Sequence, residues 1–248
     1  MRQNESLLLA IDTAAKACSA AVGQGDRILA EISLCTGHTH AAALTGCIKT
    51  VLDRAQVKPA DLDAIACTVG PGSFTGLRIG LATAKGMALP LGLSILPLST
   101  LSALAEPWLF LGLPVATLLD ARSGRLFAGI FQQGADGQVK SLLAPCQTHC
   151  HDILPLLPEH LLAVGDGASV LAGYLADRTE VDWVDFGRPR PTMQVIADSR
   201  VRPAGVLAAA RRSLEEQGEK ALLSPAAAKI DYLALSQAER LSGIQVTK

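Results

Sequence analysis

The stretch Val69-Gly-Pro-Gly-Ser-Phe-Thr-Gly-Leu-Arg-Ile-Gly80 is the densest pattern in the sequence. A short apolar segment over 64–69 precedes it, and an apolar run that continues to Pro90 follows it. This order predicts a buried strand, a tight glycine–proline loop and a helix over 74–89 that Pro90 ends.

The loop lacks the signature of a Walker phosphate loop. That motif needs Lys followed by Ser or Thr directly after its last glycine, whereas Leu77 follows Gly76 here. We expect Ser73 to cap the helix instead. Free backbone amides at a helix start bind anions, so Gly72 and Ser73 are weak candidates for an anion or nucleotide site.

Small residues recur every fourth position of the predicted helix and form a stripe on one face, namely Gly76, Gly80, Ala84 and Ala88. Such a stripe lets another backbone approach closely. From the residues alone, either the protein's own sheet or the helix of a partner protein could lie against it.

Upstream of the loop, apolar segments with short connections over 7–11, 18–22 and 27–34 predict an antiparallel three-stranded meander. A helix is predicted over 38–55, and a strand over 93–98 follows the glycine-loop helix. The first hundred residues therefore read β-β-β-α-β-α-β.

The second half of the chain repeats this pattern weakly. A shift of 108 residues maps Asp12, which ends the first strand, onto Asp120, which ends a predicted strand over 115–119. Strands over 125–132 and 139–143 follow, as in the first meander, so a structural duplication fits. Further on, the sequence predicts helices near 148–157, 167–174, 202–217 and 233–241, and a strand over 161–164.

Two such halves occur in nucleotide-binding folds, where an Asp at each strand end faces the cleft between domains. Asp12, its neighbour Thr13 and Asp120 are therefore weak nucleotide-site candidates. The simpler interpretation is that each Asp caps a turn. Neither Asp is followed by the glycine of a full phosphate loop.

Cys146, His149, Cys150 and His151 fall within six residues. Cys and His are good zinc ligands, and on a helix the first three would share a face. Because the sequence holds no second ligand cluster, we favour a helix start with two semi-buried thiols over a metal site. No metal, cofactor or catalytic residue is predicted.

Composition narrows the function classes. The 248 residues carry 22 basic and 23 acidic side chains, and only 4% are aromatic. A protein that grips nucleic acid by its own charge usually has a basic excess, so direct binding is not expected. The N-terminal apolar run is too short for a signal or membrane segment, so we expect a cytoplasmic protein without a membrane contact and with reduced cysteines.

The glycine-loop stretch closely resembles the TsaB (YeaZ) family, as do Leu9-Ala-Ile-Asp-Thr-Ala14, Cys18-Ser-Ala-Ala-Val22, His38-Thr and Leu119-Asp-Ala-Arg122. The resemblance covers about the first 130 residues. It implies an α/β fold of the actin, hexokinase and Hsp70 kind, with two related domains. We assign residues 1–105 to the N-terminal domain, 106–222 to the C-terminal domain, and 223–248 to a tail, a possible helix returning to the first domain.

The resemblance also implies a function. TsaB is a subunit of the bacterial machinery that makes threonylcarbamoyladenosine in tRNA, beside the anticodon, and is a paralogue of the catalytic subunit TsaD. By alignment, Thr100 and Leu104 occupy the positions of the two metal-binding histidines of TsaD, and these side chains cannot replace two imidazoles. The expected role is a non-catalytic scaffold that binds and activates TsaD.

The resemblance implies TsaD as the partner, TsaE as a further complex member, tRNA contact only through the complex, and a homodimer through the same helices. We expect the interface at the two helices over 38–55 and 74–89. Its candidate residues are His38, Ala42, Gly46, Gly76, Gly80, Ala84 and Ala88.

Two enzyme readings compete with this role. One is an ATP-dependent kinase or phosphatase of the same fold that uses Asp12 and Asp120, and the missing glycines count against it. The other is a metallopeptidase-like protein, and the absent histidine pair counts against that. ATP hydrolysis or a stoichiometric metal in the purified chain would favour an enzyme.

Overall fold

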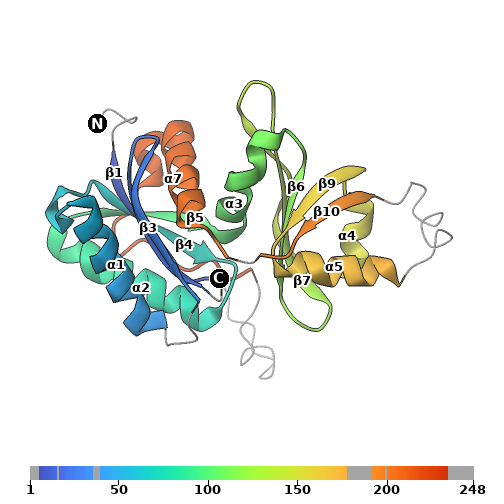
Figure 1. Ribbon diagram of the computed structural model, residues 1–248, viewed down its shortest axis with the longest axis horizontal. Helices are drawn as coiled ribbons and strands as arrows, with labels where there is room; N and C mark the ends of the chain where they lie inside the picture. Colours follow the sequence, from blue (N-terminus) through green and yellow to red (C-terminus); the bar gives the residue numbers. More distant parts are fainter. Residues whose placement is uncertain (1–5, 16, 36–39, 178–190, 199, 234–248) are drawn as a thin grey trace.

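The computed structural model describes residues 6–15, 17–35, 40–177, 191–198 and 200–233. Within them the chain forms two five-stranded sheets, each flanked by helices, that stand side by side (Figure 1). None of the helices in these ranges is long and apolar enough to cross a membrane.

The first sheet has the strand order β3-β2-β1-β4-β5. Its antiparallel meander consists of β1 (Leu7–Asp12), β2 (Cys18–Gln24) and β3 (Arg27–Leu34). Two further strands, β4 (Ala64–Gly70) and β5 (Ser94–Ser99), continue the sheet in parallel beside β1.

The second sheet repeats this topology in the order β8-β7-β6-β9-β10. Its strands are β6 (Val115–Asp120), β7 (Arg125–Gln133), β8 (Val139–His149), β9 (His160–Val164) and β10 (Thr192–Ile196). β6, β7 and β8 pair antiparallel, whereas β9 and β10 run parallel to β6. The expected duplication and fold class are therefore confirmed.

Both faces of the first sheet are covered. α1 (His40–Ala55) and α2 (Phe74–Leu91) lie on one face, and α3 (Thr100–Ala105) and α7 (Pro203–Gln217) lie on the other. α4 (Cys150–Ile153) and α5 (Asp166–Ala176) pack on the second sheet. Four 3-10 turns complete the described elements: η2 (Pro59–Asp61), η3 (Glu106–Leu111), η4 (Leu154–Leu156) and η5 (Gly218–Ala221).

The alternation of side chains along β1 explains why this strand is apolar at every position but its last. Leu9 and Ile11 point into the core beneath α1 and α2, whereas Leu8 and Ala10 point into the core beneath α7. A strand with both faces buried reads as a continuous apolar run. The sequence 7–11 is such a run.

Helix α7 packs on the first sheet, although its residues fall within the predicted second domain. Val206 and Leu207 join the core that contains Leu8 and Ala10, and the Arg212 guanidinium pairs with the carboxylate of Glu106 in η3 at 2.8 Å. Amphipathic spacing identifies a helix but not the sheet that it covers. The predicted domain boundary at residue 222 was therefore wrong.

The chain beyond α7 also lies against the first sheet. Leu223 forms a bridge with Ile95 of β5, and Ala228 is buried in the core with α1 and α2. The backbone N–H of Asp231 donates to the carbonyl of Val69 at 2.9 Å. The possible helix over 233–241 lies outside the described residues, except for its first position.

The largest differences from the predicted boundaries lie at β8, at α4 and at the end of α2. β8 continues to His149, so the predicted strand over 139–143 is too short and the helix near 148–157 begins only at Cys150. α2 continues past Pro90 to Leu91 and ends at Gly92 in the left-handed conformation. In the last turn, a proline interrupts only one hydrogen bond of the helix.

Candidate functional site

Asp12 lies at the end of β1 and is only 1% exposed. Its Oδ1 accepts hydrogen bonds from Thr68 Oγ1 at 2.5 Å and from the backbone N–H of Ala14 at 3.3 Å. Its Oδ2 has no partner among the described residues. Burial raises the pKa of Asp12 from 3.8 to about 6, and the two hydrogen bonds lower it only partly.

This raised pKa leads to a prediction on stability. At Asp12, the folded protein binds more protons than the unfolded chain between about pH 4 and 6, so the contribution of this group to stability is highest on the acid side and falls as pH rises through this window. Asp12→Asn keeps an oxygen for Thr68 and Ala14 but carries no charge. We expect it to raise the free energy of unfolding at pH 7 by about 1–3 kcal/mol and to flatten this slope.

Urea denaturation at pH 4.5 and pH 7 measures the effect directly, with the same exchange at the exposed Asp120 as the control. An Asp12→Asn protein that keeps the wild-type difference between the two pH values would contradict the assignment.

The loop after β1 and the glycine loop before α2 are hydrogen-bonded to each other. The backbone N–H of Ser73 donates to the carbonyl of Ala14 at 2.7 Å, and the Thr13 hydroxyl donates to the carbonyl of Gly76, also at 2.7 Å. A Cβ on Gly72 would lie 2.4 Å from the carbonyl oxygen of Ala14. The predicted site residues Asp12, Thr13, Gly72 and Ser73 therefore come together, but their loops close on each other.

The stripe of Gly76, Gly80, Ala84 and Ala88 faces the protein's own interior, and all four residues are buried. A Cβ on Gly76 would lie 2.0 Å from the carbonyl oxygen of Thr13, and one on Gly80 would lie 2.4 Å from Thr13 Oγ1. The prediction that this stripe forms the partner interface was wrong. The sequence spacing identified a face that another backbone approaches, and that backbone is the segment after β1.

The opposite face of α2 is open and carries its own small residues. Ala82 and Gly86 are exposed, and Leu89 exposes 67% of its surface. On the neighbouring α1, the predicted residue Gly46 is exposed, and a Cβ there would meet nothing within 4 Å. His38 and the side chain of Ala42 lie outside the described residues. We call Gly46, Ala82, Gly86 and Leu89 the outer face.

An aromatic cluster stands at the first turn of α2. Tyr232 lies beside Phe74, with ring centroids 5.4 Å apart, and its hydroxyl accepts a hydrogen bond from Arg78 Nε at 3.1 Å. The Arg78 guanidinium lies 3.8 Å from the centre of the Phe74 ring. The C-terminal segment therefore contacts the first turn of α2. No local pattern predicts this contact, because Arg78 and Tyr232 lie 154 positions apart in the chain.

The second half has an equivalent turn. β9 leads through Gly165 into α5, and a Cβ on Gly165 would lie 2.1 Å from the carbonyl oxygen of Leu118. Asp120 is exposed, and its backbone N–H donates to Asp166 Oδ1 at 3.0 Å. The Asp120 carboxylate accepts from the backbone N–H of Arg122 at 2.7 Å, which is the turn-capping interpretation.

The cysteine–histidine cluster does not form a helical face. Cys146 and His149 lie on β8, and buried Cys150 begins α4. Within the ranges that the structure describes, no group of three or more Cys, His, Asp or Glu side chains could hold a metal ion.

Burial raises the pKa of the Cys18 thiol to about 12, which keeps it protonated at neutral pH.

Known proteins resemble the chain along most of its length. The family described as "TsaD: tRNA N6-adenosine threonylcarbamoyltransferase" matches residues 34–172. The "tRNA threonylcarbamoyladenosine biosynthesis protein TsaB" of Escherichia coli (strain K12) is 32% identical over 167 residues, 64% of this chain and 71% of that protein. The protein of the same name from Bacillus subtilis (strain 168) is 29% identical over 152 residues, 61% of this chain and 66% of that protein.

Solved structures agree with the sequence matches. The structure "YeaZ from Pseudomonas aeruginosa" superposes with a TM-score of 0.74 at 25% identity and covers 92% of this chain and 99% of that one. The glycine loop, the duplicated sheets and these matches lead to one conclusion. The chain belongs to the TsaB (YeaZ) family, which is related to TsaD.

Proposed function

We propose that the protein is a non-catalytic activator subunit in the biosynthesis of threonylcarbamoyladenosine in tRNA, and that it acts by binding TsaD. The observation that carries the proposal is the closure of the two loops around Asp12. A phosphate between Ala14 and Ser73 would have to break their 2.7 Å hydrogen bond. A pseudoenzyme with the fold of its catalytic paralogue fits this arrangement.

The positions aligned with the TsaD histidines support the same role. Thr100 and Leu104 lie on α3 and are 0% and 3% exposed. Leu104 belongs to the apolar core between α3 and the second sheet. A hydroxyl and an isobutyl group in such surroundings do not make a metal centre that could transfer the threonylcarbamoyl group.

For the contact with TsaD we propose the outer face of α1 and α2 in place of the buried stripe. Ala82, Gly86 and Gly46 leave room for a facing helix to approach closely, and exposed Leu89 offers apolar area at the end of α2. Two helices from each partner would then pack as a four-helix bundle. The same face would pair two copies of this chain when TsaD is absent, and TsaE and tRNA would join through the complex.

Calorimetric titration of the purified chain with TsaD tests the contact. We expect saturable binding at one chain per TsaD, and no ATP hydrolysis by the chain alone. ATP turnover that is lost in Asp12→Asn would favour the kinase or phosphatase reading instead. Absence of binding at micromolar concentrations would contradict the partner assignment.

A further inference from the structure

The outer face continues along α2 to an exposed cluster of two aromatic rings and an arginine. Phe74 and Arg78 precede Ala82 by eight and four positions, so they lie on the same side of the helix. Phe74 exposes 40% of its surface and Tyr232 exposes 42%, and Arg78 is exposed as well. Tyrosine and arginine are enriched among the few residues that carry most of the binding energy of protein interfaces.

Two contacts hold the guanidinium of Arg78 in place. It lies 3.8 Å from the centre of the Phe74 ring, and its Nε donates to the Tyr232 hydroxyl at 3.1 Å. Its two terminal amino groups make no hydrogen bond or ion pair with the described residues. A guanidinium offers two parallel N–H donors to a carboxylate, and less side-chain entropy is lost on binding when the group is already held. Arg78 is thus arranged to bind a carboxylate.

The two helices carry a basic excess that the whole chain lacks. Their Lys, Arg, Asp and Glu side chains are Lys49, Asp53 and Arg54 of α1 and Arg78 and Lys85 of α2, all exposed or half-exposed. The whole chain has 22 basic and 23 acidic side chains. Within the described ranges, none of the four bases forms an ion pair with an acid of this chain. The surface therefore has a positive potential that an acidic partner complements.

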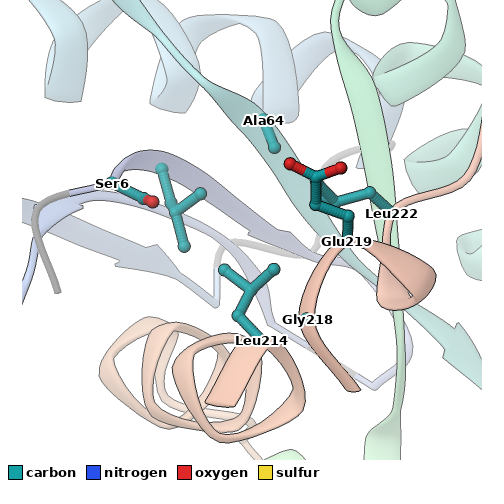
Figure 2. A pocket seen from close by; sticks show the side chains of 7 residues that line it. Ser6, Ala64, Leu214, Gly218, Glu219 and Leu222 are labelled. Carbon is teal, nitrogen blue, oxygen red and sulfur yellow. The ribbon is translucent and has the colours of Figure 1, made fainter. Parts of the chain in front are cut away.

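The other side of the first sheet differs in both respects. There, Leu214 of α7 and Leu222 close over Ala64 of β4 (Figure 2). The two arginines of α7, Arg211 and Arg212, each pair with an acid of this chain, at 3.3 Å and 2.8 Å. The basic charge that is left for a partner is thus a property of the side that α1 and α2 cover.

We propose that Arg78 anchors the contact with TsaD by pairing with a carboxylate on a TsaD helix whose exposed side is acidic. This inference rests on the proposed function, because it names the chemistry of the same contact. Tyr232 is a positioning residue in it, since its hydroxyl binds Nε and leaves the terminal amino groups to the carboxylate. Ala82 and Gly86 let the helix approach closely, and Lys85 adds to the attraction.

Charge also decides between the two occupants of the outer face. Two copies of this chain would bring two basic faces together, and like charges repel. An acidic face of TsaD is attracted instead. Salt screens interactions between exposed charges, so the contact with TsaD is expected to weaken as the salt concentration rises.

Calorimetric titrations of the full chain with TsaD at about 50 mM and about 500 mM NaCl test the proposal. Arg78→Gln removes the charge, and we expect about tenfold weaker binding at low salt but less than about a threefold loss at high salt. Arg122→Gln is the matched control, because it is the same exchange at an exposed position of the second half. We expect it to change the affinity by less than about twofold at either salt concentration.

Tyr232→Phe tests the positioning role, because it keeps the ring beside Phe74 and removes only the hydroxyl. We expect about threefold weaker binding at low salt, and no further loss when it is combined with Arg78→Gln. A purely structural role of the hydroxyl would instead give the same loss in both backgrounds.

Three results would overturn the proposal. Wild-type affinity in Arg78→Gln, or equal losses in Arg78→Gln and Arg122→Gln, would overturn it and leave the proposed function standing, because TsaD is still bound. Self-association that is tighter in the wild type than in Arg78→Gln, measured by sedimentation, would assign the cluster to the homodimer. No binding of TsaD by the wild-type chain would contradict the proposed function together with this inference.

Discussion

Gly80→Leu is expected to destabilise the isolated protein. The new side chain would have to displace Thr13, whose Oγ1 lies 2.4 Å from the position of a Cβ on Gly80, with Cys67 behind it at 3.8 Å. Overpacking of this kind costs about 1–3 kcal/mol and occasionally more. In a protein of this size we expect the melting temperature to fall by roughly 3–10 °C.

The measurement is thermal unfolding of the isolated chain, at a concentration where it is shown to be monomeric, since loss of a dimer would imitate a core defect. Gly86→Leu is the matched control, because it is the same exchange in the same helix at an exposed position with no neighbour within 4 Å. Leucine has the higher helix propensity, so the control should be unchanged or slightly more stable. A Gly80→Leu protein with the wild-type melting temperature would contradict the burial of the stripe.

Gly86→Leu is expected to weaken binding to TsaD, although it leaves the stability of the isolated chain unchanged or slightly higher. A bulky side chain on the outer face would hold a facing helix away, at a cost of about 1–3 kcal/mol in the complex. That corresponds to a roughly 5- to 150-fold weaker affinity, because each 1.4 kcal/mol is about tenfold. Calorimetric titration against TsaD measures it.

Gly173→Leu serves as the control for this second prediction. Gly173 lies on α5 of the second half, and a Cβ there would also meet nothing within 4 Å. We expect this control to bind TsaD with wild-type affinity. Wild-type affinity in Gly86→Leu would place the contact elsewhere on the protein.

The elements of the first half could be predicted closely from the sequence because each has a local signal. The strand over 27–34 matches β3 at both ends, and Ser73 caps α2 by accepting from the backbone N–H of Gly76. Alternation, capping residues and the glycine–proline loop all act over a few residues. The strand ends at Asp12 and Asp120 also have the equivalent places that the repeat implied.

The part of the chain that packs against each helix or strand could not be predicted in the same way. The four-residue spacing of Gly76 and Gly80 fixed a shared face but not the backbone of Thr13 against it. The pattern of α7 fixed a helix but not its place on the first sheet. β10 over 192–196 exposes or half-exposes every residue, so it lacks the apolar run that marks a buried strand. Each of these features depends on contacts between distant parts of the chain.

We propose that the protein activates TsaD without chemistry of its own. The direct measurement is threonylcarbamoyl transfer to tRNA by purified TsaD and TsaE, supplied with the activated threonylcarbamoyl donor, with this chain omitted, present, or present as Asp12→Asn. We expect little transfer without the chain, full transfer with it, none by the chain alone, and the wild-type rate with Asp12→Asn. Loss of transfer in an Asp12→Asn protein that still binds TsaD normally would contradict it, as would equal transfer without the chain.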